Sequence, residues 1–282
     1  MPGVTTATSI NGVLDANAKK ILTNVLKESV EMSGVSQLLQ RVPVPNLVGS
    51  IPVASAGSVD EDLDEFEHSD VNGGKFYNLE YNLKKDRVKL MSSDEAEIKS
   101  LKGSPLSIQV SASAMQLSAT LDKKSAEALD TAPQTVSAAT LWDTPTNNIY
   151  KEISRAKALM KPYKPDAIIM TQDVYDAYIS NDTLLTLATG NPTVMQNSEG
   201  IMPGTSLNIF VDDNITAKSA ILCKSQVCGA IGQGPVKARQ WDDGDSGAKV
   251  YQYDVFRQAK DCIFKNSSDE NMAAVQITGL IS

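Results

Sequence analysis

The chain of 282 residues is long enough to bury about three quarters of its unfolded surface, in one large domain or two small ones. Its formal net charge of −8 argues against a dedicated nucleic-acid binder, because neutralising phosphates requires clustered Lys and Arg. No window approaches the run of about 20 apolar residues that a membrane span needs, and the N-terminus lacks the basic start and apolar centre of a secretory signal.

The N-terminal part divides into a helical pattern and an extended pattern. Apolar residues recur at helical spacing between Val13 and Gln40. From Val42 to Gly57, apolar residues alternate with prolines, so this segment must be extended. Pro43, Pro45 and Pro52 bar it from a central strand because proline cannot donate to a sheet ladder. Such a segment has little to bury against within its own chain, and we expect it to lie across a neighbouring subunit.

An acidic block and a basic block follow, separated by a turn signal at Asn72-Gly73-Gly74. Partial alternation of apolar residues after the turn gives the basic block strand character. One interpretation is a solvated hairpin whose charges keep it soluble. The other is a long projecting hairpin that docks on the next subunit, with opposite charges setting the register. The acidic block comprises Asp60, Glu61, Asp62, Asp64, Glu65, Glu67 and Asp70, and the basic block comprises Lys75, Lys84, Lys85, Arg87 and Lys89.

A long helix is predicted from Ser104-Pro105 to about Asp130. Ser104 can cap the helix, and proline is favoured at the first helical position because its missing N–H costs nothing there. Serines and alanines fill the faces beside one apolar stripe, which is typical of an amphipathic helix packed on a core. The residues of the stripe are Leu106, Val110, Ala114, Leu117, Leu121 and Ala128.

The segment Leu141 to Asp182 predicts a helix, a proline loop, a buried strand and a second helix. Thr144 can cap the first helix, and Pro162 and Pro165 end it. Ala167 to Met170 is a short, fully apolar strand, and Thr171 can cap the second helix.

The remainder of the chain predicts strands at residues 207–213, 219–235, 236–243, 248–265 and 273–280. The glycines of Gly229 to Pro235 superficially suggest a phosphate loop. A phosphate loop needs a following helix, whereas a proline and a strand follow here, so a structural turn is favoured.

Candidate catalytic and metal motifs are weak. Gly244-Asp245-Ser246-Gly247 copies the nucleophile motif of chymotrypsin-like proteases, but the only histidine, His68, lies in the acidic block without the usual context, and a turn is favoured. The acidic block lacks the spacing of a calcium loop. No catalytic residue, cofactor site or metal site is predicted.

The cysteines Cys223, Cys228 and Cys262 are interpreted as buried reduced thiols. A disulfide between Cys223 and Cys228 requires a hairpin that brings them together. Their C-x4-C spacing has no second pair, which argues against a zinc site.

The segment from Leu141 to Asp182 resembles the axial-domain core of major capsid proteins of the Hong Kong 97 type, the shell proteins of tailed viruses. Trp142 stands before the helix as a large residue often does in that family, and Pro165 to Tyr175 is similar to a motif of the family. The order of hairpin, long helix and closing strands, with Gly229 to Pro235 among them, extends the resemblance over about residues 28–280.

This resemblance implies an α+β fold of the Hong Kong 97 type in four parts. These parts are an N-terminal arm (1–44), an extended hairpin loop (45–95), a peripheral domain with the long spine helix (96–132 and 236–282) and an axial domain (133–235).

The implied function is that of a major capsid protein and not of an enzyme. Such a protein self-assembles into the pentamers and hexamers of an icosahedral shell around the double-stranded DNA of a tailed bacterial or archaeal virus, in the host cytoplasm, and becomes part of the virion. Scaffolding, portal and decoration proteins are its further partners, DNA is contacted non-specifically, and no cofactor or membrane takes part. The expected inter-subunit contacts are Pro43, Pro45, Pro52, Asp60, Glu61, Asp64, Glu65, Lys75, Lys84, Lys85 and Arg87.

Three alternatives are compatible with the same sequence. The first is an encapsulin-type nanocompartment shell that loads protein cargo. The second is a tail tube or another virion structural protein, because these also use extended arms. The third is a hydrolase, which would need a pocket with perturbed carboxylates that the sequence does not identify.

Overall fold

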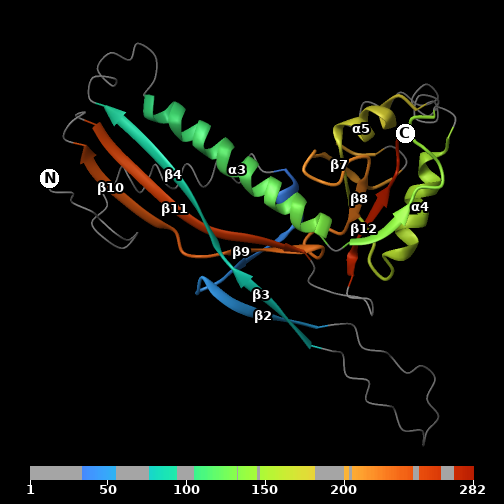
Figure 1. The fold of residues 1–282 in the computed structure, drawn as a ribbon, viewed down its shortest axis with the longest axis horizontal. Helices are drawn as coiled ribbons and strands as arrows, with labels where there is room; N and C mark the ends of the chain where they lie inside the picture. The colour runs from blue at the N-terminus through green and yellow to red at the C-terminus, as the bar shows by residue number, and fades with distance from the viewer. Residues whose placement is uncertain are drawn as a thin grey trace, which may run out of the picture.

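The computed structural model describes residues 34–54, 76–93, 105–131, 133–144, 147–181, 200–202, 205–243, 248–261 and 270–282, and Figure 1 shows their arrangement. The sequence predictions for residues 1–33, the acidic block, the turn at 72–74, Lys75, the motif at 244–247 and Cys262 lie outside these residues. The described elements are η1 (Val35–Leu38, a 3-10 helix), β1 (Gln40–Pro43), β2 (Val48–Ala54), β3 (Phe76–Asn82), β4 (Lys84–Ser93), α3 (Pro105–Thr131), β5 (Pro133–Ser137), α4 (Ile149–Leu159), β6 (Ala167–Met170), α5 (Gln172–Ile179), β7 (Asn208–Val211), β8 (Ala220–Cys223), β9 (Gly229–Gln233), β10 (Lys237–Asp243), β11 (Ala248–Asp261) and β12 (Asn271–Thr278).

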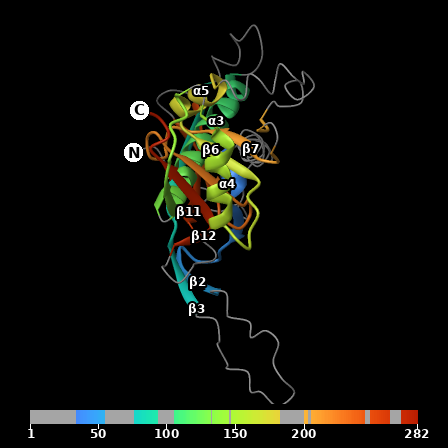
Figure 2. The ribbon, with the colours of Figure 1, turned by 90° about the vertical axis from the view of Figure 1, so that its right-hand side faces the viewer.

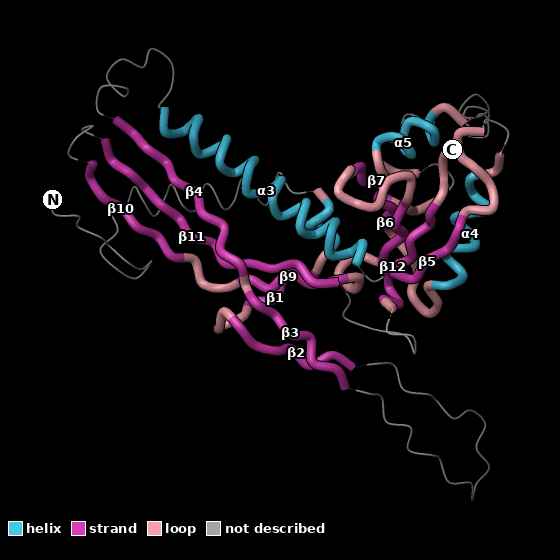
Figure 3. Tube along the Cα trace, in the orientation of Figure 1, coloured by secondary structure: helices cyan, strands magenta, loops and turns pink. Residues whose placement is uncertain are grey.

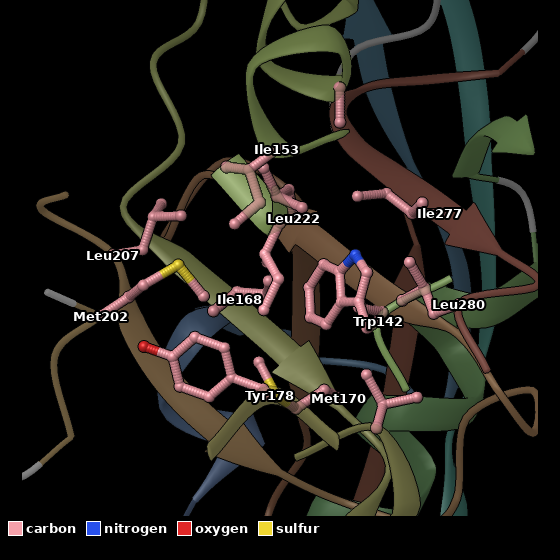
Figure 4. Close-up of a cluster of buried hydrophobic side chains, with 14 of the residues drawn as sticks. Trp142, Ile153, Ile168, Met170, Tyr178, Met202, Leu207, Leu222, Ile277 and Leu280 are labelled. Atoms are coloured by element: carbon pink, nitrogen blue, oxygen red, sulfur yellow. The ribbon is translucent and has the colours of Figure 1, made fainter. Parts of the chain in front are cut away.

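One five-stranded sheet, which we call the apolar sheet, has the strand order β5-β12-β8-β6-β7. Its strand β6, which lies between β8 and the edge strand β7, is completely buried, as its apolar sequence predicts. Side chains alternate between the faces of a strand, so Ile168 packs with α4 and α5 while Ile169 packs with η1 and the end of α3. Trp142 lies among Ile168, Met170 and Leu280 in the first of these two cores (Figure 4). Both faces of the apolar sheet are therefore covered by the chain itself.

The two helices of the apolar sheet begin close to their predicted positions but use different caps. Helix α4 begins at Ile149, and the Asn148 side chain accepts a hydrogen bond from Tyr150 N at 3.0 Å. The prediction of Thr144 as its cap was wrong, because the Thr144 carbonyl already accepts from Asn147 N in a separate turn. Helix α5 follows Thr171 as predicted, yet it is Asp213 Oδ1 that accepts from the first helical N–H at 2.8 Å.

The other five-stranded sheet, which we call the charged sheet, is built around the 14-residue strand β11. Strand β4 runs antiparallel along one side of β11, and β10 and then β9 run along the other side (Figure 3). Strand β1 adds in parallel to β9 at the edge. All closing strands that the sequence predicts are present, but β9 and β12 lie in different sheets from those expected. Strand β9, placed in 133–235, pairs within the charged sheet, and β12, placed in 236–282, pairs with β5 and β8.

Helix α3 joins the two sheets. It begins at Pro105 as predicted, and Val110 and Leu117 of its stripe pack on the charged sheet. Further along the helix, Leu121 and Leu129 reach the core on the inner face of the apolar sheet. Figure 1 shows the helix lying along the charged sheet and ending beside the apolar sheet. The predicted stripe residue Ala128 is only half-buried.

The proline-punctuated segment is extended, as predicted, but it has partners within the chain. At the end of the helical pattern predicted between Val13 and Gln40, the described residues form only the short 3-10 helix η1. This helix is held against α3 by Asp122, which accepts hydrogen bonds from Gly34 N at 2.9 Å and Ser36 N at 2.8 Å. Val44 then packs with Tyr81 and Leu83. The expectation that this segment has little to bury against in its own chain was therefore wrong for its first part.

Strands β2 and β3 form a separate antiparallel hairpin that projects away from both sheets (Figure 2). The chain leaves this hairpin at Leu83, whose side chain is buried, and continues as β4 into the charged sheet. The prediction that the basic block belongs to the hairpin was wrong for Lys84, Lys85, Arg87 and Lys89, because burial of Leu83 marks the point where pairing passes from β2 to β11.

Gly229–Gln233 form strand β9, in agreement with the strand predicted over 219–235, so the structural turn favoured over Gly229 to Pro235 was wrong for these five residues. A Cβ at Gly229 would approach the backbone carbonyl oxygen of Lys260 to 2.7 Å, and one at Gly234 would approach Leu83 Cδ1 to 2.6 Å. Glycine is required here because β9 packs closely against its neighbours.

Candidate assembly surface

The residues expected to contact neighbouring subunits fall into separate regions of the molecule. Pro43 is the exposed last residue of the edge strand β1, Pro45 is exposed just beyond that strand, and Pro52 lies in β2. Near them, the side chains of Leu47 and Val48 are 39% and 67% exposed, so the base of the hairpin presents apolar surface. Lys84, Lys85 and Arg87 lie on β4. The structure therefore does not bring the prolines and the cations into one cluster.

Strand alternation divides the basic residues of β4 between two faces of the charged sheet. Leu90 packs with Val110 and Leu117 of α3, so the even-numbered residues of β4 face α3. Lys84 accordingly lines a pocket beside this helix. Lys85, Arg87 and Lys89 lie on the opposite face, which we call the outer face. The three residues of β4 that are predicted to contact a neighbouring subunit are therefore divided between the two faces of the charged sheet.

The face toward α3 holds a buried ionic cluster centred on Asp86. Lys124 Nζ donates to Asp86 Oδ1 at 2.6 Å, and Arg257 Nε donates to Asp86 Oδ2 at 2.6 Å. Arg257 Nη2 also donates to the Leu117 carbonyl at 2.7 Å. Burial alone would raise the pKa of Asp86, but the hydrogen bonds from Lys124 and Arg257 outweigh it and hold this pKa below its ordinary value. The cluster ties β4, β11 and α3 together.

A pocket of about 280 Å³ opens beside this cluster. Its Lys84 has no ion-pair partner among the described residues. The pocket holds both signs of charge and no histidine or cysteine, so its residues suit a polar contact better than acid–base chemistry. Its lining residues are Lys84, Lys124, Glu127, Ala128, Thr131, Arg257, Gln258 and Ala259.

The outer face of the charged sheet has a different arrangement, with cations surrounding one buried carboxylate. Arg87 Nε and Nη2 donate to Asp254 at 2.7 and 3.2 Å, and the Asp254 residue is only 3% exposed. The hydrogen bond from Arg87 lowers the pKa of Asp254, and the positive charges of Lys85 and Arg239 lower it further. Sequence reasoning missed Arg239, although Lys237, Arg239 and Trp241 alternate along β10 in a way that predicts one shared face.

Chemistry of the catalytic or metal-binding kind has little support in the described part of the chain. Within it, no group of three or more His, Cys, Asp or Glu side chains is arranged to hold a metal ion. Cys223 and Cys228 are free thiols and fully buried. A hydrogen bond with Cys228 and burial both raise the pKa of the Cys223 thiol, which keeps it protonated and unreactive. None of the described helices is long and apolar enough to span a membrane.

Comparisons by sequence find no relative of this chain. No family model matches it. No curated protein matches it either.

Solved structures, in contrast, match it over almost its whole length. A phage-related protein from Bordetella bronchiseptica is 12% identical, with a TM-score of 0.62, over 91% of this chain and 96% of that one. A virus-like particle from Pyrococcus furiosus is 10% identical, with a TM-score of 0.62, over 93% and 100%. The capsid of cyanophage P-SCSP1u is 10% identical, with a TM-score of 0.60, over 97% and 92%.

Coverage of about nine tenths or more in both directions means that the likeness extends over the fold as a whole and is not confined to one part of it. Identities this low establish a shared fold. The chain therefore has the mixed α+β capsid fold of the Hong Kong 97 type, as its own sequence predicted.

Proposed function

We propose that this chain is a structural shell protein, the major capsid protein of a tailed bacterial or archaeal virus. It would self-assemble into the pentamers and hexamers of an icosahedral shell around double-stranded DNA, in the host cytoplasm, and remain in the virion. The observation that carries this proposal is the likeness over 97% of the chain to the capsid of a cyanophage. The role is structural and not enzymatic.

Each part of the chain has a proposed role in the shell. Residues 1–44 are the N-terminal arm, residues 45–95 contain the extended loop, the charged sheet with α3 is the peripheral domain, and the apolar sheet with α4 and α5 is the axial domain. Strand β9 belongs with the peripheral domain and β12 with the axial domain, because they pair there. Scaffolding, portal and decoration proteins are proposed as further partners, and DNA as a non-specific one.

The hairpin supports an assembly role because it has few contacts within its own chain. Among the described residues, β2 pairs only with β3, and Val48 is 67% exposed. An isolated two-stranded hairpin is marginally stable in water, so this one is expected to gain order against a neighbouring subunit. Contacts of this kind are individually weak, but repetition around a closed shell makes them collectively strong. The proposed contacts are the eleven residues named from the sequence, from Pro43 to Arg87.

Electron microscopy of the protein expressed alone, over a range of concentrations and salt, tests the proposal. We expect closed shells from the full chain. Deletion of residues 58–75 should leave a monomer with an unchanged circular dichroism spectrum and abolish shells, because the two sheets do not depend on the hairpin. Helical tubes would favour a tail tube protein instead. Normal shells from the deletion variant would refute the role of the hairpin.

An encapsulin-type nanocompartment is a second candidate, favoured by the likeness to a virus-like particle from Pyrococcus furiosus. The two candidates differ in what the shell contains. Nuclease-protected DNA in particles purified from the native source supports a viral capsid, whereas a protein cargo without DNA supports the nanocompartment.

A further inference from the structure

The turn between strands β8 and β9 connects the two sheets of the molecule. Strand β8 belongs to the apolar sheet and β9 to the charged sheet, and only residues 224–228 separate them. Cys223 is the last residue of β8, and Cys228 immediately precedes β9. The two cysteines therefore stand on either side of the junction, one next to each sheet.

The thiols of these cysteines are in direct contact. Cys228 Sγ donates to the Leu38 carbonyl oxygen at 3.7 Å, so in the hydrogen bond between the two thiols Cys223 is the donor and Cys228 the acceptor. Both side chains are fully buried in the core on the inner face of the apolar sheet. A disulfide requires two sulfurs that meet in this way, and the C-x4-C spacing alone could not show that they do.

Hydrogen bonds of the backbone hold the turn in the shape that brings the thiols together. The Lys224 carbonyl accepts from Cys228 N at 3.0 Å, which closes the turn on itself. Gln226 N donates to the Leu38 carbonyl at 2.6 Å, and Asn271 Nδ2 donates to the Cys228 carbonyl at 2.6 Å. The turn is thus attached to η1 on one side and to β12 on the other, so the contact between the thiols is built into the fold.

We propose that Cys223 and Cys228 form an intrachain disulfide that joins the two sheets once the protein has left a reducing cytoplasm. The timing rests on the proposed function, because a virion assembles in a reducing cytoplasm and then persists outside it. The bond closes a loop of six residues and connects the two ends of the turn covalently.

The oxidant that the reaction requires is a peroxide. One cysteine attacks the O–O bond as its thiolate, water leaves, and the sulfur becomes a sulfenic acid. The neighbouring thiol then attacks that sulfur, the S–S bond forms, and a second water leaves. Two thiols are thereby oxidised while one hydrogen peroxide is reduced. Burial keeps the Cys223 thiol protonated, so the reaction is slow, and the same burial protects the pair inside the host cell.

Trypsin digestion tests the pairing directly, because Lys224 lies between the two cysteines. The folded full-length protein is treated with hydrogen peroxide, remaining thiols are blocked with N-ethylmaleimide after unfolding, and the digest is analysed by mass spectrometry. We expect residues 219–224 linked to residues 225–237, and dithiothreitol should remove this linkage. Recovery of the two peptides only as separate species, with their cysteines blocked or further oxidised, would overturn the proposal.

Two cysteine variants provide the matched controls. Cys262→Ala removes the cysteine outside the pair and should retain the linked peptides. Cys228→Ala should lose them and form no bond between Cys223 and Cys262. A linkage to Cys262 in place of the expected pair would overturn the assignment. If Cys228→Ala does not fold, the wild type and Cys262→Ala still decide the pairing.

The effect on stability is measured within one variant, so that no difference in sequence enters the comparison. Oxidised Cys262→Ala should unfold at a temperature about 5 °C higher than the same variant reduced with dithiothreitol, as expected for a bond that closes a short loop. Cys228→Ala should show no such difference. Equal unfolding temperatures despite complete linkage would overturn the stabilising role of the bond.

Particles from the native source test the timing. Infected cells lysed in N-ethylmaleimide should yield the separate peptides, whereas particles released from the cells should yield the linked pair. Linked peptides inside the cell, or separate peptides from released particles, would overturn the timing. Digestion of the soluble subunit does not require assembly. Absence of shells would therefore count against the proposed function, while the linked peptides would still decide the pairing.

Discussion

The two sheets of this protein are similar in size but differ in what covers them. Helices α4 and α5 cover one face of the apolar sheet, and η1 with the end of α3 covers the other, so its inner strand β6 is inaccessible. The charged sheet has α3 on one face, where a buried ionic cluster lies, and exposed cations on the other. The apolar sheet is complete within one chain. On the other face of the charged sheet, no helix of the described residues packs.

This difference separates folding from assembly within one molecule. Substitutions in the apolar sheet should change the free energy of unfolding of the subunit. Substitutions on the outer face of the charged sheet should change association and its dependence on salt, with little effect on folding. Substitutions in the ionic cluster around Asp86 should affect both folding and association, because the cluster stabilises the sheet that carries the outer face.

The largest effect is expected in the buried inner strand β6 of the apolar sheet. Ile168→Ala should lower the free energy of unfolding by about 2–5 kcal/mol, because it removes buried methyl groups and leaves a cavity in a strand held on both sides. Val211→Ala, in the edge strand β7 and 42% exposed, is the matched control and should cost less than about 1 kcal/mol. Urea titration of both variants measures the change in the free energy of unfolding. Equal changes in the two variants would mean that burial in β6 contributes no more to stability than the exposed position in β7.

A smaller effect is expected from the ionic cluster of the charged sheet. Arg257→Met removes one of the two cations that neutralise the partly buried Asp86 and should cost about 2–4 kcal/mol, since Lys124 remains. Lys123→Met removes only an exposed pair with Glu127 at 3.9 Å and should change stability by less than about 0.5 kcal/mol. Thermal unfolding of the two variants provides the comparison. A stable Arg257→Met variant would show that α3 holds β4 and β11 without the cluster.

The smallest effect should appear as acid sensitivity of the charged sheet. The pKa values of Asp86 and Asp254 are below their ordinary value in the folded state, so their contribution to stability is present above about pH 3.9 and is lost as the pH falls through the folded values. The contribution of these two carboxylates to the free energy of unfolding should therefore be nearly constant from pH 7 to 5 and decline below about pH 4. Asp254→Asn should make that decline shallower. An unaltered slope in this variant would contradict the assignment.

Sequence reasoning succeeded where the signal is local. Helix α3 begins at its predicted proline, and Thr171 precedes α5 as expected. Strand β6 is as buried as its apolar composition predicts. In each case propensity, capping and periodicity lie within one short segment and agree with one another.

Sequence reasoning failed where the strands that pair are distant in the chain. Strand β4 continues the sequence of the hairpin yet pairs with β11, more than 150 residues away. The basic block could be found from the sequence. The division of its residues between the two faces of the charged sheet could not, because that division depends on the pairing of β4 with β11. Arg239 and Trp241 were missed because only the register of β10 on β11 brings them beside Lys89. Strand register depends on the whole sheet and is not encoded in any one of its strands.

The way β3 runs on into β4 has a mechanical consequence. Strand β4 lies antiparallel along ten residues of β11, so a pull on the hairpin acts along the strands and loads these ten residue pairs together, in shear. A pull across the strands would instead open the pairs one after another, at much lower force. The hairpin is thus attached to the subunit in the orientation in which a β-sheet resists tension best.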